Sequence, residues 1–391
     1  MNIVLLAHNW DYMPLAPYKI GLLLSKRGHN VHLLLPNKKT SLKYNAKYIN
    51  TSYTLYLCPT ILWGGLKKGS DPLDLITRLY LLRKLEYDII LAFDSRPAVI
   101  LPAVYGKLIK KIPLIIYWTD WFGRGGIIAE RSGKFYKFFF EGIETFFEEY
   151  FRKYADSYAV ICRPLEKRLR SLGYRKKVYS LPYGCEKRSL NGDINIDDLK
   201  KKLNLPTSYP LIGCVGSLHP KDAKFLFRSL DILGRQIEVK LILIGHNIFR
   251  NKYQIPEHII ETGRLSEMEM SLYIHACDIM VLPLRNNIAN NGRWPSKLNE
   301  YLIIGKAIVS TEISVVCELL KLIKFGETAR DIPEDFAEKI YGLLKDKDLL
   351  KKYGENAEKL ASEYLSWPVI IKNFEGFITE TLNEFVMGNK R

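Results

Sequence analysis

The sequence predicts an α/β protein built from two Rossmann-like, doubly wound parallel-sheet domains. Short runs of β-branched and aliphatic residues alternate with longer segments whose apolar residues recur at helical spacing, and this order is typical of parallel sheets covered by helices. The alternation begins twice, first at Ile3 and again at Leu211. The 391 residues are enough for two domains that each bury a core.

The first series of strands and helices fills the first half of the chain. A β-type run begins at Ile3, a helical pattern follows through Leu24, and Gly28 ends that pattern before the next strand. We expect further strands at 31–35, 88–93, 114–118, 157–161 and 178–181, and helices at 74–85, 97–109 and 165–172. Strands joined through helices are expected to run parallel.

A second series follows a polar and basic stretch that ends at Pro210 and reads as a connection between domains. It comprises strands from 211 and at 239–244, 279–282 and 307–311, and helices at 266–276, 335–344 and 349–364. Trp367-Pro368 interrupts the pattern before a last helix at 369–385. We therefore expect a first domain at 1–185, a linker at 186–209, a second domain at 210–367, and a C-terminal helix at 368–391 that packs back on the first domain.

Composition limits the kind of protein and of partner. Hydrophobic residues make up 47% of the chain and charged residues 26%, as in ordinary globular proteins. The formal charge of +16 attracts anions, which include nucleic acid, acidic lipid surfaces and phosphorylated substrates. The six cysteines show no CxxC spacing and are expected to be buried thiols. The sequence shows neither a signal peptide nor a bilayer-spanning run, so we expect a cytoplasmic protein.

The stretch 293–306 has the pattern of a helix that opens onto an anion. Pro295 suits the first helical position, because its φ is already helical and its missing N–H would have no partner there. Leu298, Leu302 and Ile303 form an apolar stripe, and Gly305 lies where a C-terminal cap belongs. The β-branched residues that follow predict a buried strand.

The charges of this stretch favour a nucleotide diphosphate. The free N–H groups of a helix start bind phosphate, to which Ser296 adds a hydroxyl and Lys297 and Arg293 add positive charge. Glu300 lies one turn further along, where a carboxylate can accept hydrogen bonds from two sugar hydroxyls. The alternative is that Lys297 and Glu300 form a solvated ion pair, which contributes little.

Four segments together resemble the GT-B fold glycosyltransferases, most closely the large retaining family called family 4 or group 1. The first two are Tyr-Ser-Leu-Pro-Tyr-Gly-Cys-Glu at 179–186 and Val-Gly-Ser-Leu at 215–218. The third is Thr-Gly-Arg-Leu at 262–265 with the helix and strand that follow it to 283. The fourth is Pro-Ser-Lys-Leu-Asn-Glu-Tyr-Leu with the strand that follows it, at 295–311. The resemblance covers nearly the whole chain. It implies the GT-B fold, in which two Rossmann-like domains face an interdomain cleft, with the acceptor bound by the first and a nucleotide sugar by the second.

The resemblance assigns roles in the last segment and reveals two departures. Glu300 matches the second Glu of the family's two-Glu signature, which holds the ribose, and Lys297 matches a basic position of some relatives. The first Glu of the signature falls on Gly292, which puts the usual contact with the donor sugar in doubt. Ser217, in the donor-binding loop, replaces the family's Arg, and Arg293 can compensate for that lost charge.

The other donor positions come from the same resemblance. Gly216 is the glycine of the phosphate loop. The family's next basic phosphate contact has no clear match in this sequence, although Lys221 and Lys224 are nearby. Arg264 is similar to a residue near the nucleobase.

Polar residues after the strands of the first domain are candidates for the acceptor site. Asp120 follows the strand 114–118, and it can act as a general base in an inverting enzyme or orient the acceptor in a retaining one. The alternatives are a helix cap or an ion pair with Arg124. Arg124 lies among Gly123, Gly125 and Gly126, which can cradle an acceptor phosphate. His8 and Asp94, each after its own strand, are weaker candidates for acceptor binding.

An aromatic segment begins at Lys134. One helical stripe is expected to pack on the sheet: Phe139, Ile143, Phe147, Tyr150 and Tyr154. Phe135, Phe138 and Phe146 remain outside this stripe. Together with nearby lysines and arginines they suggest a peripheral contact with an anionic membrane surface, while the alternative is that the aromatic residues are core.

These observations favour transfer of a hexose from a UDP- or GDP-linked sugar to a hydroxyl of a glycan or lipid-linked acceptor, with retention, as in the family. The sequence contains no DxD and no metal-ligand cluster, so we expect no metal and no cofactor. No nucleic-acid motif is present, so we expect no nucleic-acid partner. The expected location is cytoplasmic, peripheral on the inner face of the membrane.

Two alternatives keep the same fold. A nucleotide-sugar 2-epimerase would interconvert sugars without an acceptor. A catalytically silent relative that serves as a scaffold would explain Gly292 and Ser217, and it would bind neither UDP nor GDP.

Overall fold

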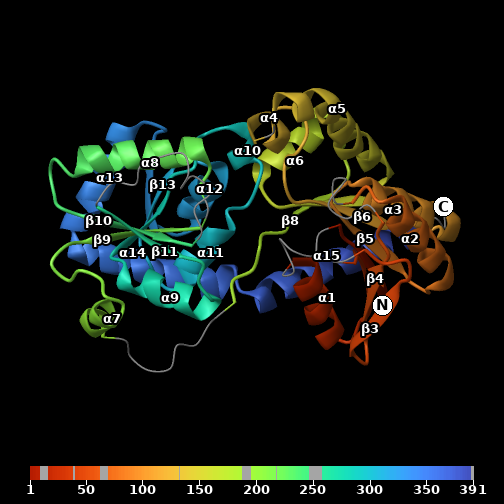
Figure 1. Ribbon diagram of the computed structural model, residues 1–391. Coiled ribbons are helices and arrows are strands. Elements are labelled where there is room, and N and C mark those ends of the chain that lie inside the picture. Colours follow the sequence, from red (N-terminus) through yellow and green to blue (C-terminus); the bar gives the residue numbers. More distant parts are fainter. Residues whose placement is uncertain are drawn as a thin grey trace. The chain divides into compact units, whose positions relative to one another are not determined.

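The structure, a computed structural model, describes residues 1–8, 16–37, 40–61, 69–131, 133–186, 195–216, 218–245 and 258–388 (Figure 1). The chain forms two compact units. The first unit comprises Met1–Pro182, Gly292–Trp294 and Pro368–Arg391, and the second comprises Tyr183–Asn291 and Pro295–Trp367. Each unit contains one sheet, and the expected α/β class with two parallel-sheet domains is confirmed.

The sheet of the first unit has the strand order β3-β4-β2-β1-β5-β6-β7-β8. Neighbouring strands are parallel except for the antiparallel pair β3 and β4. The strands are β1 (Asn2–Leu6), β2 (Asn30–Pro36), β3 (Asn45–Asn50), β4 (Tyr53–Cys58), β5 (Ile89–Phe93), β6 (Leu114–Trp118), β7 (Ser157–Val160) and β8 (Val178–Ser180). The sequence pattern did not predict β3 or β4. β3 is polar and partly exposed at the edge of the sheet, so it lacks the apolar run that marks a buried strand.

Helices of the first unit connect and cover these strands. They are α1 (Ala16–Lys26), α2 (Pro72–Lys84), α3 (Pro97–Lys110), α4 (Ile127–Arg131), α5 (Lys134–Tyr150), the 3₁₀ turn η1 (Phe151–Tyr154), α6 (Arg163–Ser171) and α15 (Trp367–Gly388). Asp71 caps α2 by accepting hydrogen bonds from the backbone N–H groups of Leu73 and Asp74, as expected at a helix start.

The sheet of the second unit has the order β11-β10-β9-β12-β13-β14, with all strands parallel. The strands are β9 (Leu211–Val215), β10 (Lys240–Ile244), β11 (Ile259–Gly263), β12 (Ile279–Leu282), β13 (Ile308–Thr311) and β14 (Gly326–Ala329). The helices are α7 (Ile196–Lys202), α8 (Pro220–Leu233), α9 (Glu267–Ala276), α10 (Ile288–Asn291), α11 (Ser296–Ile303), α12 (Ser314–Leu322), α13 (Pro333–Lys345), α14 (Lys347–Lys359) and the π-helical turn η2 (Leu360–Tyr364). The buried rings of Phe225 on α8 and Phe336 on α13 meet edge to face, 5.3 Å apart.

The segment expected to be a linker, 186–209, contains a helix of the second unit. In α7, Lys200 is buried, and its Nζ lies 3.2 Å from the carboxylate of Asp278. Asn195 caps the helix by accepting hydrogen bonds from two backbone N–H groups. The sequence did not predict α7, because the lysines and aspartates of this helix are also typical of a polar linker. Residues 187–194 lie outside the described part of the chain.

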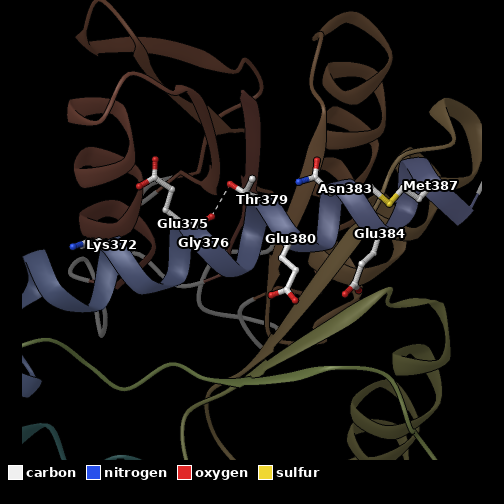
Figure 2. A pocket seen from close by; sticks show the side chains of 8 residues that line it. All are labelled: Lys372, Glu375, Gly376, Thr379, Glu380, Asn383, Glu384 and Met387. Carbon is white, nitrogen blue, oxygen red and sulfur yellow. Dashed lines mark hydrogen bonds between the residues drawn. The ribbon is translucent and has the colours of Figure 1, made fainter.

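Helix α15 belongs to the first unit although it is the last element of the chain. Glu375 pairs with Arg27 and with His29 Nε2, the latter at 2.6 Å. Thr381 lies 2.8 Å from the hydroxyl of Ser157 in β7. Figure 2 shows Glu380 and Glu384 on one side of the helix, where both carboxylates pair with Lys177. These polar contacts hold α15 along the β7–β8 edge and the end of α1.

We expect Glu375→Gln to reduce the stability of the first unit by about 1 kcal/mol at pH 7. Burial raises the pKa of Glu375, but the hydrogen bonds from His29 and Arg27 outweigh burial and lower it below its ordinary value. The carboxylate therefore contributes stability above the pKa of the unfolded chain, and this contribution is lost as the pH falls through the lower, folded pKa. Urea unfolding from pH 7 to pH 3 should show the wild-type advantage shrinking in acid.

Glu384→Gln is the matched control on the same helix. Its side chain is 61% exposed, so the substitution should cost less than about 0.5 kcal/mol at any pH. Equal losses in the two variants would contradict the role given to Glu375.

Candidate functional site

Helix α11 begins and ends close to where the sequence placed it. Pro295 is the N-cap residue and not the first helical residue, and the helix start receives no side-chain capping hydrogen bond. At the other end Gly305 has φ +72°. Its N–H donates to Leu302 O at 3.1 Å, and Lys306 N–H donates to Tyr301 O at 3.0 Å. This pair of bonds is a Schellman motif, which confirms Gly305 as the cap.

Two side chains fix α11 against the sheet. Tyr301 is fully buried, and its hydroxyl accepts from the backbone N–H of Val215 at 2.8 Å and lies 3.4 Å from Val281 O. Burial raises the pKa of Tyr301 well above its ordinary value, so the hydroxyl stays neutral. Asn299 donates to the carbonyl oxygens of Tyr183 and Gly184 at 2.9 and 3.1 Å. The helix is therefore tied to the carboxyl ends of β9 and β12 and to the segment that opens the second unit.

Gly216 and Lys297, which are 81 positions apart in the sequence, are in contact. Gly216 ends β9 with φ +83°, and its N–H donates to Ile244 O at 2.6 Å. A Cβ at this position would lie 2.5 Å from Lys297 Cε and 2.9 Å from its Nζ. A larger residue here would displace the end of the lysine side chain. With glycine at this position, the ammonium group lies against the loop where the sequence predicted phosphate contacts.

Other donor candidates follow strands at the same carboxyl edge of the second sheet. Arg264 is exposed after β11, next to Gly263 with φ +72°. Lys221 is exposed in the first turn of α8, where its N–H donates to His219 Nδ1. Ser296 is exposed at the start of α11. Ser217 lies outside the described residues.

Glu300 lies one turn along α11 from Lys297 and is partly exposed. Burial raises the pKa of Cys185 to about 12, and the negative charge of Glu300 adds to this increase. The Glu300 carboxylate is therefore near Cys185, which directly follows the two residues whose carbonyl groups Asn299 binds. The structure thus brings Lys297 together with Gly216, while Arg264 and Lys221 border the same edge of the sheet.

The motif around α11 is divided between the two units. Gly292, Arg293 and Trp294 belong to the first unit, while Pro295 and the helix belong to the second. Within the first unit, Trp121 N–H donates to Gly292 O at 2.9 Å, and Asp120 and Arg293 form an antiparallel bridge. The backbone of Arg293 is therefore placed beside Asp120. Asp120 also lies too far before the start of α4, at Ile127, to be its cap.

His8 and Asp94 meet at the carboxyl ends of the adjacent strands β1 and β5. His8 Nδ1 lies 3.8 Å from Asp94 Oδ2. Asp94 accepts hydrogen bonds from the N–H and the hydroxyl of Thr119, at 3.2 and 2.5 Å. Burial raises the pKa of Asp94, and its φ of +68° is unfavourable for a residue with a Cβ. Such strain is typical of functional sites.

The backbone amides around Arg124 do not form the phosphate cradle that the glycines suggested. The carboxylate of Glu148 accepts from Phe122 N–H and Gly123 N–H at 2.9 and 2.7 Å. The hydroxyl of Thr145 accepts from Arg124 N–H at 2.9 Å. The loop is therefore already bound by side chains of α5, which corrects the sequence interpretation. The side chain of Arg124 is exposed.

Sequence reasoning missed Glu148 because the interpretation of its segment considered the aromatic residues and not the acidic ones. Glu148 is 5% exposed, and burial raises its pKa. It also accepts from the indole N–H of Trp118 at 2.9 Å. The guanidinium of Arg152, buried one turn further along, stacks 3.7 Å from the Trp118 ring and offsets part of the burial cost of Glu148. The sequence contains one signal for an inward polar face, because polar residues recur every three or four positions in this segment.

Two features are absent from the described residues of the chain. No helix in this part of the chain is long and apolar enough to cross a membrane. No group of three or more His, Cys, Asp or Glu side chains in the same residues is placed to hold a metal ion.

Comparisons with known proteins identify the fold of the chain and a family that part of it resembles. The family model "Glycosyl transferases group 1" matches residues 195–360, which include the loop at Gly216 and all of α11. The chain has the GT-B fold, and residues 195–360 are similar to the group 1 glycosyltransferases. A comparison with curated proteins gives no match.

Several solved structures superpose on nearly the whole chain. A sucrose-phosphate synthase from Thermosynechococcus elongatus superposes with a TM-score of 0.73 at 13% identity, over 98% of this chain and 100% of that one. HepE from Anabaena, in complex with UDP and glucose, gives 0.68 at 14% identity over 97% and 100%. WaaG, a glycosyltransferase involved in lipopolysaccharide biosynthesis, gives 0.64 at 14% identity over 95% and 98%.

We expect Gly216→Ala to displace Lys297 and to weaken binding of UDP or GDP at least tenfold. The new Cβ meets the lysine side chain, and the positive φ costs roughly 1 kcal/mol of stability. Calorimetric titration measures the affinity, and chemical unfolding measures the stability.

Gly173→Ala is its control, because Gly173 also has a positive φ, +88°, but a Cβ there would meet nothing within 4 Å. It should lose a similar amount of stability without a change in nucleotide affinity. Unchanged nucleotide affinity in Gly216→Ala would refute the contact-based role of Lys297.

We expect Glu148→Gln to destabilise the first unit by about 1–3 kcal/mol, because an amide NH₂ would face an N–H donor that now has a carboxylate partner. Denaturant unfolding measures the loss. Glu149→Gln, whose carboxylate pairs with Arg168 nearer the surface, should cost less. A loss no larger than that of Glu149→Gln would show that the carboxylate does not hold the loop.

Proposed function

We propose that this chain is a glycosyltransferase that moves a hexose from a UDP- or GDP-linked sugar to a hydroxyl of a glycan or lipid-linked acceptor. The observation that carries the proposal is the contact of Lys297 with Gly216 at the start of α11, inside the region that matches group 1. Three of the similar solved structures are HepE in complex with UDP, UDP and glucose, or UDP-glucose.

Transfer requires stabilisation of the leaving diphosphate. In this proposal the uncapped start of α11, the Ser296 hydroxyl and the Lys297 ammonium bind the diphosphate, and Glu300 accepts hydrogen bonds from the ribose. Lys221 and Arg264 extend the positive edge towards the second phosphate and the base. Fixed positive charge at the leaving group lowers the barrier without a metal ion, because the groups are already oriented.

The acceptor is assigned to the first unit. His8 and Asp94 are placed to bind acceptor hydroxyls, and Arg124 supplies an exposed positive charge. Asp120, beside the backbone of Arg293, orients the attacking hydroxyl. A retaining reaction, in which the donor's own phosphate oxygen assists attack from the front face, makes no demand for a strong protein base. A cytoplasmic place on the inner face of a membrane belongs to the same proposal.

Two other functions make different predictions. A nucleotide-sugar 2-epimerase would convert the sugar without an acceptor, which product analysis of an acceptor-free reaction detects. A scaffold, suggested by Gly292 in place of the signature's first Glu, would bind neither UDP nor GDP.

The deciding experiment is a thermal-shift and calorimetric panel of nucleotides and nucleotide sugars with the full chain. A ligand that binds the native state raises the melting temperature. Lys297→Ala and Glu300→Ala should each weaken binding roughly 10- to 100-fold, because each removes a charge-assisted hydrogen bond.

Lys321→Ala and Glu338→Ala, on exposed positions of α12 and α13, are the matched controls and should leave affinity unchanged. If no nucleotide raises the melting temperature, the transferase proposal fails. If nucleotides bind but both α11 variants keep wild-type affinity, the site is elsewhere.

A further inference from the structure

Helix α5 has its polar and apolar faces reversed relative to an ordinary surface helix. A surface helix normally turns its apolar stripe to the core and its charges to water. Among the described side chains of α5, the buried ones are Thr145 and Glu148, while several large aromatic and aliphatic side chains are exposed. The expectation that Phe139, Ile143 and Tyr150 pack on the sheet is therefore wrong.

The inward face of α5 uses all four of its acidic residues. Glu148 binds the backbone of the loop after β6, and Glu141 accepts from Gly125 N–H at 3.3 Å. Glu144 pairs with Arg96, and Glu149 accepts from Arg168 Nε at 3.1 Å. The helix is thus held to the first unit by its polar side, which commits the other side to the surface.

The outward face is a continuous apolar stripe that follows the helical period. Its exposed fractions are Phe135 77%, Phe138 83%, Phe139 50%, Ile143 52%, Phe146 50% and Tyr150 43%. The rings also contact one another, as Phe135 and Phe139 do at 4.6 Å and Phe146 and Tyr150 at 5.0 Å. Contiguous exposed apolar surface of this kind marks an interaction site.

The charges beside the stripe favour an anionic partner. Among the described side chains of α5, the exposed ones are apolar except for Lys137. A surface hollow of about 450 Å³ adjoins the stripe and is lined by Arg124, Lys137, Phe138, Glu141, Gly142 and Thr145. Among the described lining residues, Arg124 and Lys137 are cations, and the carboxylate of Glu141 already accepts a hydrogen bond from Gly125. At the other end Lys153 lies over the ring of Tyr150.

We propose that α5 lies flat in the headgroup region of an anionic phospholipid bilayer, with its aromatic stripe at the acyl boundary and a lipid phosphate in the hollow between Arg124 and Lys137. Aromatic side chains on one face with lysines at its borders are what the interface favours. The inference deepens the membrane part of the proposed function, but it does not require nucleotide binding.

The hollow along α15 in Figure 2 offers no comparable surface. Its described lining residues all belong to that helix, and two of its carboxylates, Glu375 and Glu380, pair with cations of the first unit. The pocket of about 680 Å³ at the amino ends of β9, β12 and β13 is lined by both lysines and carboxylates, so its charges select no ligand class.

Flotation of the full chain with vesicles tests the proposal. We expect the protein to float with vesicles that contain phosphatidylglycerol, to float little with phosphatidylcholine alone, and to bind less at high salt. Phe135→Ser/Phe138→Ser should weaken partitioning at least roughly tenfold, because two exposed rings lose their apolar contact with lipid. Arg124→Ala/Lys137→Ala should remove most of the preference for anionic vesicles.

The control is Leu108→Ser/Ile109→Ser, which removes two exposed apolar side chains, 58% and 61% exposed, from α3 in the same unit. It should float like the parent chain. Circular dichroism of each variant shows whether it is folded.

Three results would overturn the proposal: no flotation of the parent, flotation unaffected by Phe135→Ser/Phe138→Ser, or a dimer that this variant converts to a monomer in light scattering. The last result would assign the stripe to a second copy of the chain. Nucleotide binding, measured separately, would distinguish failure at the membrane from failure of the transferase proposal.

Discussion

The hydroxyl of Tyr301 is the interaction on which the arrangement of the second unit depends. It bridges the backbone at the ends of β9 and β12 from inside α11, in a position where no water can replace it. Because the hydroxyl is held by two strands, the start of α11 has a fixed height above the sheet. Lys297 lies one turn before Tyr301 on the helix, and this geometry brings its ammonium to Gly216. A buried neutral hydroxyl thus positions a partly exposed charge.

In the first unit, a buried carboxylate binds the backbone of a loop, as the Tyr301 hydroxyl does in the second unit. Its loop after β6 presents several consecutive N–H groups, and such groups need acceptors when they are shielded from water. Glu148 and Thr145 supply them from α5, and Arg152 and Trp118 offset the cost of burying the carboxylate. The consequence appears on the opposite side of the helix. Since the inward positions are taken by polar residues, the aromatic residues of α5 must face outward.

Much of the fold was predictable because its signals are local. Apolar runs gave the central strands of both sheets, and a proline followed ten positions later by a glycine gave the limits of α11. The edge strand β3 and helix α7 were not predicted, because their stability comes from tertiary partners such as the contact of Lys200 with Asp278 and not from a hydrophobic pattern. The site, too, was predictable only in part. The motif identified Lys297 and Gly216 individually, and the βαβ order implied that both lie at one edge of the sheet. The direction in which α5 faces could not be predicted, because helical periodicity defines two faces without saying which one the protein uses.

The reversal of α5 also changes how the glycines around Arg124 should be interpreted. Consecutive backbone N–H groups attract any anion, and the sequence offered no way to tell a substrate phosphate from a carboxylate of the same chain. Here the internal carboxylate has the advantage, because Glu148 is covalently present at high effective concentration and is already ordered by α5. An external phosphate would have to displace it and leave it buried without its donors, at a cost of several hydrogen bonds. Anion binding in this chain is therefore better supported where a positive residue stands in the first turn of a helix without a side-chain cap, as Lys297 does on α11, than where amides are merely close together.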